Sequence, residues 1–208
     1  MYLINISLNY HNAPLEVREK FTFSPPEIQK VDHLLNGEKS VLENLILVTC
    51  NRTEIYAVVD QIHTGRYFIR NFLAEWFEVS LSELDRYVTV NVQETAVRHL
   101  FEVAVGLDFK IKGESQILGQ VKQAFQEATS AQSIGNILNH LFRQAIIFAK
   151  KMHTDYRVSE LAQSSSQAAL HQIKQYLGTV NGKKLAVVGA GKWEGKLRVI
   201  LAQWGLMR

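Results

Sequence analysis

The sequence predicts an α/β fold in which an N-terminal α/β sandwich leads into a long connecting helix and an incomplete Rossmann-like start. Strand-like and helix-like segments interleave through the first part of the chain, and the composition then shifts towards helix. Near the end, a buried-strand pattern runs into a glycine turn. We therefore expect one domain over residues 1–153, the connecting helix over 154–178, and the start of a nucleotide-binding domain over 179–208.

Composition and charge exclude several classes of protein. An apolar content of 47% with 21% charged residues is typical of a soluble globular protein. The single cysteine rules out an internal disulfide and a multi-cysteine zinc site, and it fits the reducing cytoplasm, so we expect no metal. No run approaches the roughly 20 apolar residues of a membrane span, and the N-terminus reads as a strand and not as a signal peptide. The net charge of +3 permits an RNA partner without arguing for one.

The N-terminal elements follow from local patterns. Apolar and polar residues alternate over 4–9, which predicts a half-buried strand. A turn cluster over 10–14 precedes a short charged helix over 16–20. Ser24 is followed by two prolines and by a glutamate three residues on, which starts a helix that Asn36-Gly37 ends.

Two strand-like apolar runs, 45–48 and 55–59, flank a polar corner that contains Cys50. A hairpin would present this corner at the end of a sheet, where a ligand can approach. The thiolate is the nucleophilic form of cysteine, and the guanidinium of Arg52, two residues away, favours that charged form. The other interpretation is that Cys50 is a small core residue, as most lone intracellular cysteines are.

The remaining elements of the first domain become increasingly helical. An amphipathic helix over 65–77 would pack on the sheet, Ser80 and Glu83 cap a short helix, and 87–92 alternates like a strand. An amphipathic helix follows over 94–105.

His99 falls at the edge of the apolar stripe of that helix, where a ring contacts both core and solvent. It is either a packed, hydrogen-bonded histidine or a functional one. A loop over 106–113 comes next, and two longer helical patterns run over 134–153 and 161–177.

The helix that opens over 113–121 crowds acid and amide groups into its first turns. Glu114 is there either as a favourable charge at a helix N-terminus or as a site residue. Gln116 and Gln120 are four residues apart and share a helix face, so their amides can bind one ligand or one neighbour.

A buried-strand pattern over 184–188 flows into a glycine turn, which is the opening of a dinucleotide-binding unit. Backbone amides and a helix N-terminus would hold a pyrophosphate there. The candidate cofactor contacts are Gly189, Ala190, Gly191, Lys192, Trp193 and Glu194. The pattern is impaired, because the third glycine of G-x-G-x-x-G should stand where the chain has Glu194. Only 13 residues follow Gly195, which leaves no second strand and no ribose-binding position, so we expect an incomplete site.

A series of specific motifs occurs in order along the chain. They are Asn9-Tyr10, Ala13-Pro14, Glu16-Val17-Arg18-Glu19-Lys20, Thr49-Cys50-Asn51-Arg52-Thr53-Glu54-Ile55-Tyr56, His99-Leu100-Phe101, Gly106-Leu107-Asp108, Gly113-Glu114 and Gln116-Ile117-Leu118-Gly119-Gln120. Together they resemble glutamyl-tRNA reductase, and the resemblance extends from residue 1 to about residue 191.

The resemblance implies an N-terminal catalytic domain, a long spinal helix, an NADPH-binding domain and a C-terminal dimerisation domain. This chain would hold the first two and the start of the third. In the family's chemistry, the Cys50 thiolate attacks the ester of glutamyl-tRNA and forms a thioester, which NADPH reduces to glutamate 1-semialdehyde, the entry to tetrapyrrole (porphyrin and haem) biosynthesis. The partners that the resemblance implies are glutamyl-tRNA, the downstream aminomutase and a second copy of the chain, although the dimerisation domain is expected to be absent.

The same resemblance assigns roles to individual residues. Cys50 and His99 are the catalytic residues, the histidine as a proton shuttle or orienting group. Arg52 binds the glutamyl carboxylate with its two-pronged donor geometry. The remaining substrate contacts are Thr49, Asn51, Glu114, Ser115, Gln116 and Gln120, with Glu114 suited to the α-ammonium group.

The chain departs from the family pattern at Phe109, where a serine that contacts substrate is expected. Losing one hydrogen bond to a charged ligand costs about 1.5–3 kcal/mol, roughly 10- to 150-fold in binding. Lys110 and Lys112 also place charge where the family's loop is apolar. Two functions therefore remain. One is a reductase whose present chain performs at most the acyl-transfer half, and the other is a non-catalytic remnant that binds charged tRNA or a partner protein.

Overall fold

A computed structural model describes residues 1–109, 116–158, 172–173 and 175–178 of the chain. Its strands and helices are, in order, β1 Tyr2–Asn9, α1 Leu15–Lys20, α2 Pro25–Asn36, β2 Val41–Thr49, β3 Arg52–Val59, α3 Ile62–Trp76, α4 Leu81–Leu84, β4 Thr89–Val92, α5 Glu94–Val105, α6 Ile117–Ser130 and α7 Asn136–Asp155. Each of these elements lies close to a segment that the sequence predicts. Among the helices so described, none combines the length and the apolar character that crossing a membrane requires.

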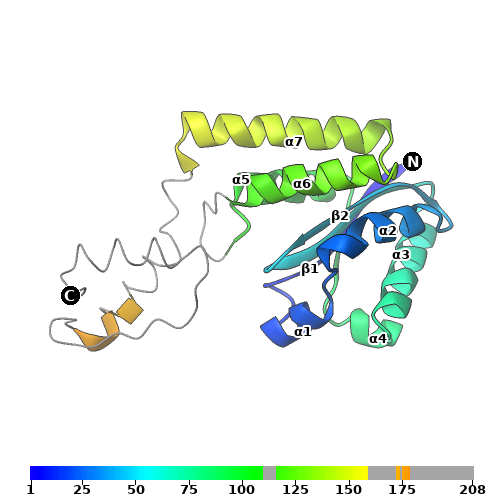
Figure 1. Ribbon diagram of the computed structural model, residues 1–208, viewed down its shortest axis with the longest axis horizontal. Coiled ribbons are helices and arrows are strands. Elements are labelled where there is room, and N and C mark those ends of the chain that lie inside the picture. Colours follow the sequence, from blue (N-terminus) through cyan, green and yellow to red (C-terminus); the bar gives the residue numbers. More distant parts are fainter. Residues whose placement is uncertain (110–115, 159–171, 174, 179–208) are drawn as a thin grey trace.

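Helices cover both faces of one four-stranded sheet (Figure 1). The strand order is β2-β3-β1-β4, and each neighbouring pair is antiparallel. Helices α1 to α4 lie on one face, whereas α5, α6 and α7 lie on the other (Figure 1). Each face has its own hydrophobic core. The predicted α/β sandwich is therefore confirmed, with three layers and an antiparallel sheet.

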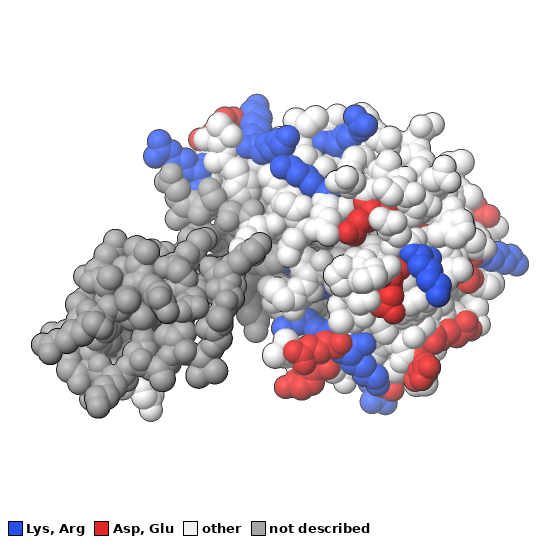
Figure 2. Space-filling model, viewed as in Figure 1, with Lys and Arg blue, Asp and Glu red and all other residues white. Residues whose placement is uncertain are grey.

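The surface of the described part carries both signs of charge. In Figure 2, basic side chains gather along the edge formed by α7, while acidic and basic side chains are mixed over the half of the view that holds α1 and α4. This distribution agrees with the small net charge of +3.

The strand β1 corrects one prediction from the sequence. Its apolar residues Ile4, Ile6 and Leu8 lie in the core shared with α2 and α3. The intervening Asn5, Ser7 and Asn9 are also buried, with exposed fractions of 0%, 1% and 6%. The prediction of a half-buried strand is therefore wrong, because the helical layer that contains α5 covers the second face of the sheet as well. The polar row of β1 points into the protein.

Local start signals act as predicted. Ser24 and Glu27 form a capping box at the start of α2, which ends at Asn36. Ser80 accepts a hydrogen bond from the backbone N–H of Glu83 at the start of α4, at 3.1 Å.

The predicted connecting helix overlaps the end of α7. Residues 154 and 155, which we assigned to it, are the last residues of α7. Arg157 has a φ of +50°, a left-handed conformation that interrupts a right-handed helix. Residues 172–173 and 175–177 are helical. The rest of the predicted helix and the whole glycine turn, with its candidate cofactor residues 189–194, lie outside the described residues.

The N-terminus of α7 is held by a carboxylate from the sheet. Glu43 of β2 is buried and accepts hydrogen bonds from the backbone N–H groups of Ile137 and Leu138, at 3.1 and 2.7 Å. A helix start leaves such N–H groups without helical partners, so a carboxylate there is stabilising. At Gly135 a Cβ atom would meet the Glu43 carboxylate, so a larger residue there would displace this carboxylate from the start of α7. The contact docks α7 onto the sheet.

We predict that Glu43→Gln lowers the free energy of unfolding by about 1–3 kcal/mol, because the amide nitrogen cannot accept one of the two hydrogen bonds. Urea unfolding followed by circular dichroism measures this change. Glu19→Gln, at an exposed position on α1, is the matched control and should unfold like the wild type. Equal midpoints for the two variants would contradict the capping role.

Candidate active site

Cys50 and Asn51 form the two-residue turn between β2 and β3. Thr49 and Arg52 are the paired residues on either side of it, and the Asn51 N–H donates to Thr49 Oγ1 at 3.1 Å. Cys50 is exposed. The interpretation of this cysteine as a small core residue is therefore wrong, and the thiol lies where a substrate can reach it.

Unlike the exposed Cys50, the side chain of Arg52 points into the protein. Its side chain has no exposed surface, and Nη1 donates to Glu54 Oε1 at 2.7 Å and to Asp108 Oδ2 at 3.0 Å. Nη2 donates to the backbone carbonyl of Asp108. The ring of Phe109 covers the guanidinium, with its centroid 4.5 Å from Cζ. The aromatic residue that departs from the family pattern thus packs on the arginine.

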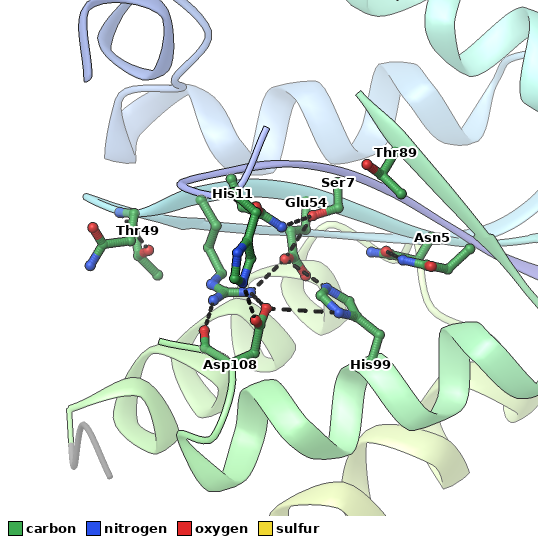
Figure 3. Close-up of polar contacts among 12 residues, drawn as sticks. Asn5, Ser7, His11, Thr49, Glu54, Thr89, His99 and Asp108 are labelled. Atoms are coloured by element: carbon green, nitrogen blue, oxygen red, sulfur yellow. Dashed lines mark hydrogen bonds and ion pairs between the residues drawn. The ribbon is translucent and has the colours of Figure 1, made fainter. Parts of the chain in front are cut away.

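Glu54 is the centre of the polar cluster shown in Figure 3. It is fully buried, and its carboxylate accepts hydrogen bonds from Ser7 Oγ at 3.0 Å, Tyr56 OH at 2.7 Å and Arg52. Burial by itself would raise the pKa of Glu54. The hydrogen bond with His99 and the charge of Arg52 outweigh burial and lower that pKa to about 2. Glu54 is therefore an anion at neutral pH.

His99 reaches the cluster from α5, on the opposite side from β1 (Figure 3). Its Nε2 lies 2.9 Å from Glu54 Oε1, and its Nδ1 lies 3.9 Å from Asp108 Oδ2. Burial would lower the pKa of His99, but the hydrogen bond and the negative charge of Glu54 outweigh burial and raise it. The ring is therefore both packed and placed beside the buried charges.

Asp108 joins the cluster to the surface. It accepts a hydrogen bond from His11 Nε2 at 2.8 Å, and the His11 side chain is 58% exposed. Burial would raise the pKa of Asp108, but the hydrogen bond from His11 and the charge of Arg52 lower it. His11, Glu54 and Asp108 are functional candidates that the local sequence patterns did not predict. The signal was present, because Glu54 and Asp108 both belong to the motifs that carry the family resemblance.

The other predicted site residues divide into two groups. Gln116 is the N-cap residue of α6, and Gln120 lies one turn into that helix. Glu114 and Ser115 lie outside the described residues. The structure thus joins Arg52 and His99 through the carboxylate of Glu54.

The cluster contains atoms of the kind that bind metals. Glu54, His99 and Asp108 each offer a ligand atom, and these atoms lie within 4.8 Å of one another. The Arg52 guanidinium already bridges the two carboxylates, and its positive charge would repel a metal ion at that place. The absence of a metal remains a prediction from the sequence.

Comparisons with known proteins agree on one family. Residues 6–156 match the sequence model described as Glutamyl-tRNAGlu reductase, N-terminal domain. Over 192 residues, 92% of this chain, the sequence is 63% identical to the glutamyl-tRNA reductase of Limosilactobacillus reuteri (strain DSM 20016) and 47% identical to that of Bacillus cereus (strain ATCC 14579). The aligned stretches are 46% and 43% of those proteins, so the chain spans about half the length of the curated relatives it matches. The solved glutamyl-tRNA reductase of Methanopyrus kandleri aligns with a TM-score of 0.63 at 29% identity, over 97% of this chain and 47% of that one.

The raised pKa of His99 predicts a pH-dependent stability. The folded protein binds the imidazole proton more tightly than the unfolded chain does, so this stabilisation is complete below the ordinary value of 6.5 and is lost as the pH rises through the folded pKa. We expect the free energy of unfolding of the wild type to fall between about pH 6 and about pH 9. The fall should be smaller in His99→Gln.

Urea unfolding at both pH values measures the difference in slope, which a uniform loss of stability in the variant does not affect. His33→Gln, at an exposed position on α2, should follow the wild type. The same pH slope in wild type and His99→Gln would show that Glu54 does not hold the His99 proton.

Proposed function

The chain belongs to the glutamyl-tRNA reductase family, and from that premise we propose that Cys50 attacks the ester carbonyl that joins glutamate to the 3′ end of its tRNA. A bond forms between Sγ and the carbonyl carbon, the bond from that carbon to the ribose oxygen breaks, and the tRNA leaves with a proton on that oxygen. The product is a glutamyl thioester on Cys50. The observation that supports this proposal best is the exposure of the thiol at the tip of the β2–β3 hairpin, next to a buried cluster of charges.

We propose that Arg52 selects the glutamyl carboxylate. Both ion-pair partners of the guanidinium among the described residues are carboxylates, and Asp108 is the accessible one, with a side-chain exposure of 15% against 0% for Glu54. A substrate carboxylate therefore takes the place of Asp108, while Glu54 keeps the guanidinium in position. Thr49 and Asn51 on the turn contact the remaining polar atoms of the substrate.

The opposite wall of this site is proposed from the family alone. It consists of Glu114, Ser115, Gln116 and Gln120, with Glu114 binding the α-ammonium group. His99 supplies the proton to the leaving ribose oxygen, since its Nδ1 is beyond hydrogen-bond distance from Asp108 and its raised pKa favours the charged form.

The reduction of the thioester completes the family's reaction. In the family, bound NADPH would supply the hydride for the step from thioester to glutamate 1-semialdehyde in tetrapyrrole biosynthesis, and residues 189–194 are the proposed contacts for it. Without that step, water hydrolyses the thioester slowly and releases glutamate. The family also suggests a cytoplasmic homodimer that passes its product to an aminomutase.

A second candidate function is binding without turnover. Phe109 favours it, because a ring packs on Arg52 where the family pattern has a serine that contacts substrate. In that case the chain would bind charged tRNA or a partner protein and form no thioester.

Glutamyl-tRNA that carries labelled glutamate separates the two functions. We predict that the label becomes covalently attached to the protein, or that the ester is cleaved above the background rate, and that Cys50→Ser abolishes both. The measurement is label retained after acid precipitation, together with the rate of deacylation. An aminoacyl-tRNA with a neutral amino acid is the substrate control. A wild type that neither retains the label nor deacylates the substrate would favour binding without turnover.

Arg52→Lys keeps the positive charge but loses the two-pronged geometry. We predict that kcat/KM for glutamyl-tRNA falls roughly 10- to 150-fold, the size of one lost hydrogen bond to a charged group, mainly through KM. Because Arg52 is buried, urea unfolding must accompany the kinetics. Arg66→Lys, at an exposed position on α3, is the matched control.

The preference for glutamyl-tRNA over glutaminyl-tRNA gives a readout that stability does not affect. Arg52→Lys should reduce this preference. A variant that keeps the full preference would show that another residue selects the carboxylate.

A further inference from the structure

The proposed chemistry places a nucleoside beside Cys50. The ester that the thiol attacks joins glutamate to the ribose of the terminal adenosine, so this ribose is one bond from the reacting carbonyl. If the glutamyl side chain lies towards Arg52, the adenosine must lie along another border of the β2–β3 turn. This inference rests on the proposed function and extends it to the nucleotide end of the substrate.

The segment after β1 forms such a border. Asn9 pairs with Arg52 across the sheet, and the backbone N–H of Tyr10 donates to the Asn51 carbonyl at 3.1 Å. The chain from Tyr10 onward therefore starts next to Cys50. It surrounds an open cavity of about 500 Å³ that is lined by residues 10–16 and Arg18. The cavity is large enough for a nucleoside.

The cavity presents an aromatic face. The rings of Tyr10 and His11 lie with their centroids 3.9 Å apart and their planes at 34°. Tyr10 supports one side of the imidazole, and Asp108 holds its Nε2 at 2.8 Å. The His11 side chain is nevertheless 58% exposed. A ring that is held at two points and still exposed is prepared for stacking, because little freedom is lost when a ligand binds.

The charges of the cavity favour a base over a phosphate. Arg18 and Glu16 both line it, so their charges oppose each other. Stacking of a base on an aromatic side chain does not need a net charge and contributes about 1–3 kcal/mol. The contact between His11 and Asp108 also links this cavity to Arg52, because the same carboxylate touches both residues.

We propose that His11, supported by Tyr10, is the stacking platform for the terminal adenine of the aminoacyl-tRNA. The cavity over residues 10–18 then receives the nucleoside while the glutamyl group enters beside Arg52. His11 is a binding residue for the leaving group, and the thiol lies between the two halves of the substrate.

Binding of two stable analogues tests the platform without any chemistry at Cys50. One is adenosine with glutamate joined to its 3′ position through an amide, and the other is the same glutamyl amide on a ribose that lacks the base. We expect the wild type to bind the adenosine analogue roughly 5- to 150-fold more tightly than the ribose analogue. His11→Ala should lose this preference, whereas His11→Phe, which keeps a ring, should retain most of it.

His63→Ala, at an exposed histidine on α3, is the matched control and should bind both analogues like the wild type. Isothermal titration calorimetry gives the dissociation constants. Equal affinity of the wild type for the two analogues, a preference that persists in His11→Ala, or no binding of either analogue would each overturn the platform.

The labelling experiment with Cys50→Ser decides separately whether the thioester forms. If the protein prefers the adenosine analogue through His11 but retains no labelled glutamate, only the proposed thioester is contradicted. If the protein retains the label but binds both analogues equally, only the proposed stacking platform is contradicted.

Discussion

The buried ion pair between Arg52 and Glu54 is the interaction on which the rest of the site depends. A guanidinium without exposed surface has to be paired, since an isolated buried charge costs several kcal/mol. The pairing draws together parts of the chain that are far apart in sequence: β3 supplies both members, β1 supplies Ser7, α5 supplies His99, and the residues after α5 supply Asp108. The cluster therefore fixes how the helical layer sits on the sheet.

The same cluster separates the buried charges from the cysteine. Along the β2–β3 hairpin, Arg52 points inward and Cys50 lies at the exposed tip, so the proposed nucleophile is open to solvent while the charge of Arg52 is shielded from water. Shielding strengthens an electrostatic contact, because water no longer screens it. The substrate carboxylate that we propose at Arg52 would gain from this setting. Asp108 also accepts a hydrogen bond from His11 at the surface, so one carboxylate contacts both the exposed His11 and the buried Arg52.

Phe109 and Glu43 show how the helical layer closes over the sheet. Phe109 stacks on the Arg52 guanidinium and also belongs to the core that α5, α6 and α7 form, so a single ring bridges the charges and the apolar packing. At the far end of the layer, Glu43 holds the start of α7 through two backbone N–H groups. Both contacts place a charged group inside the protein beside other groups that stabilise it.

The sequence by itself determined the elements, the position of the cysteine at the β2–β3 corner, and the family. Short-range rules were sufficient for these, because caps such as Ser24 with Glu27, the alternation in β1 and the polar corner at Cys50 depend on neighbours along the chain. It did not determine the surroundings of Arg52, the burial of Asn5, Ser7 and Asn9, or the contact of His11 with Asp108. Each of these depends on which helix covers which face of the sheet. That choice joins residues 7, 54, 99 and 108, which no local pattern relates, and only the tertiary structure decides it.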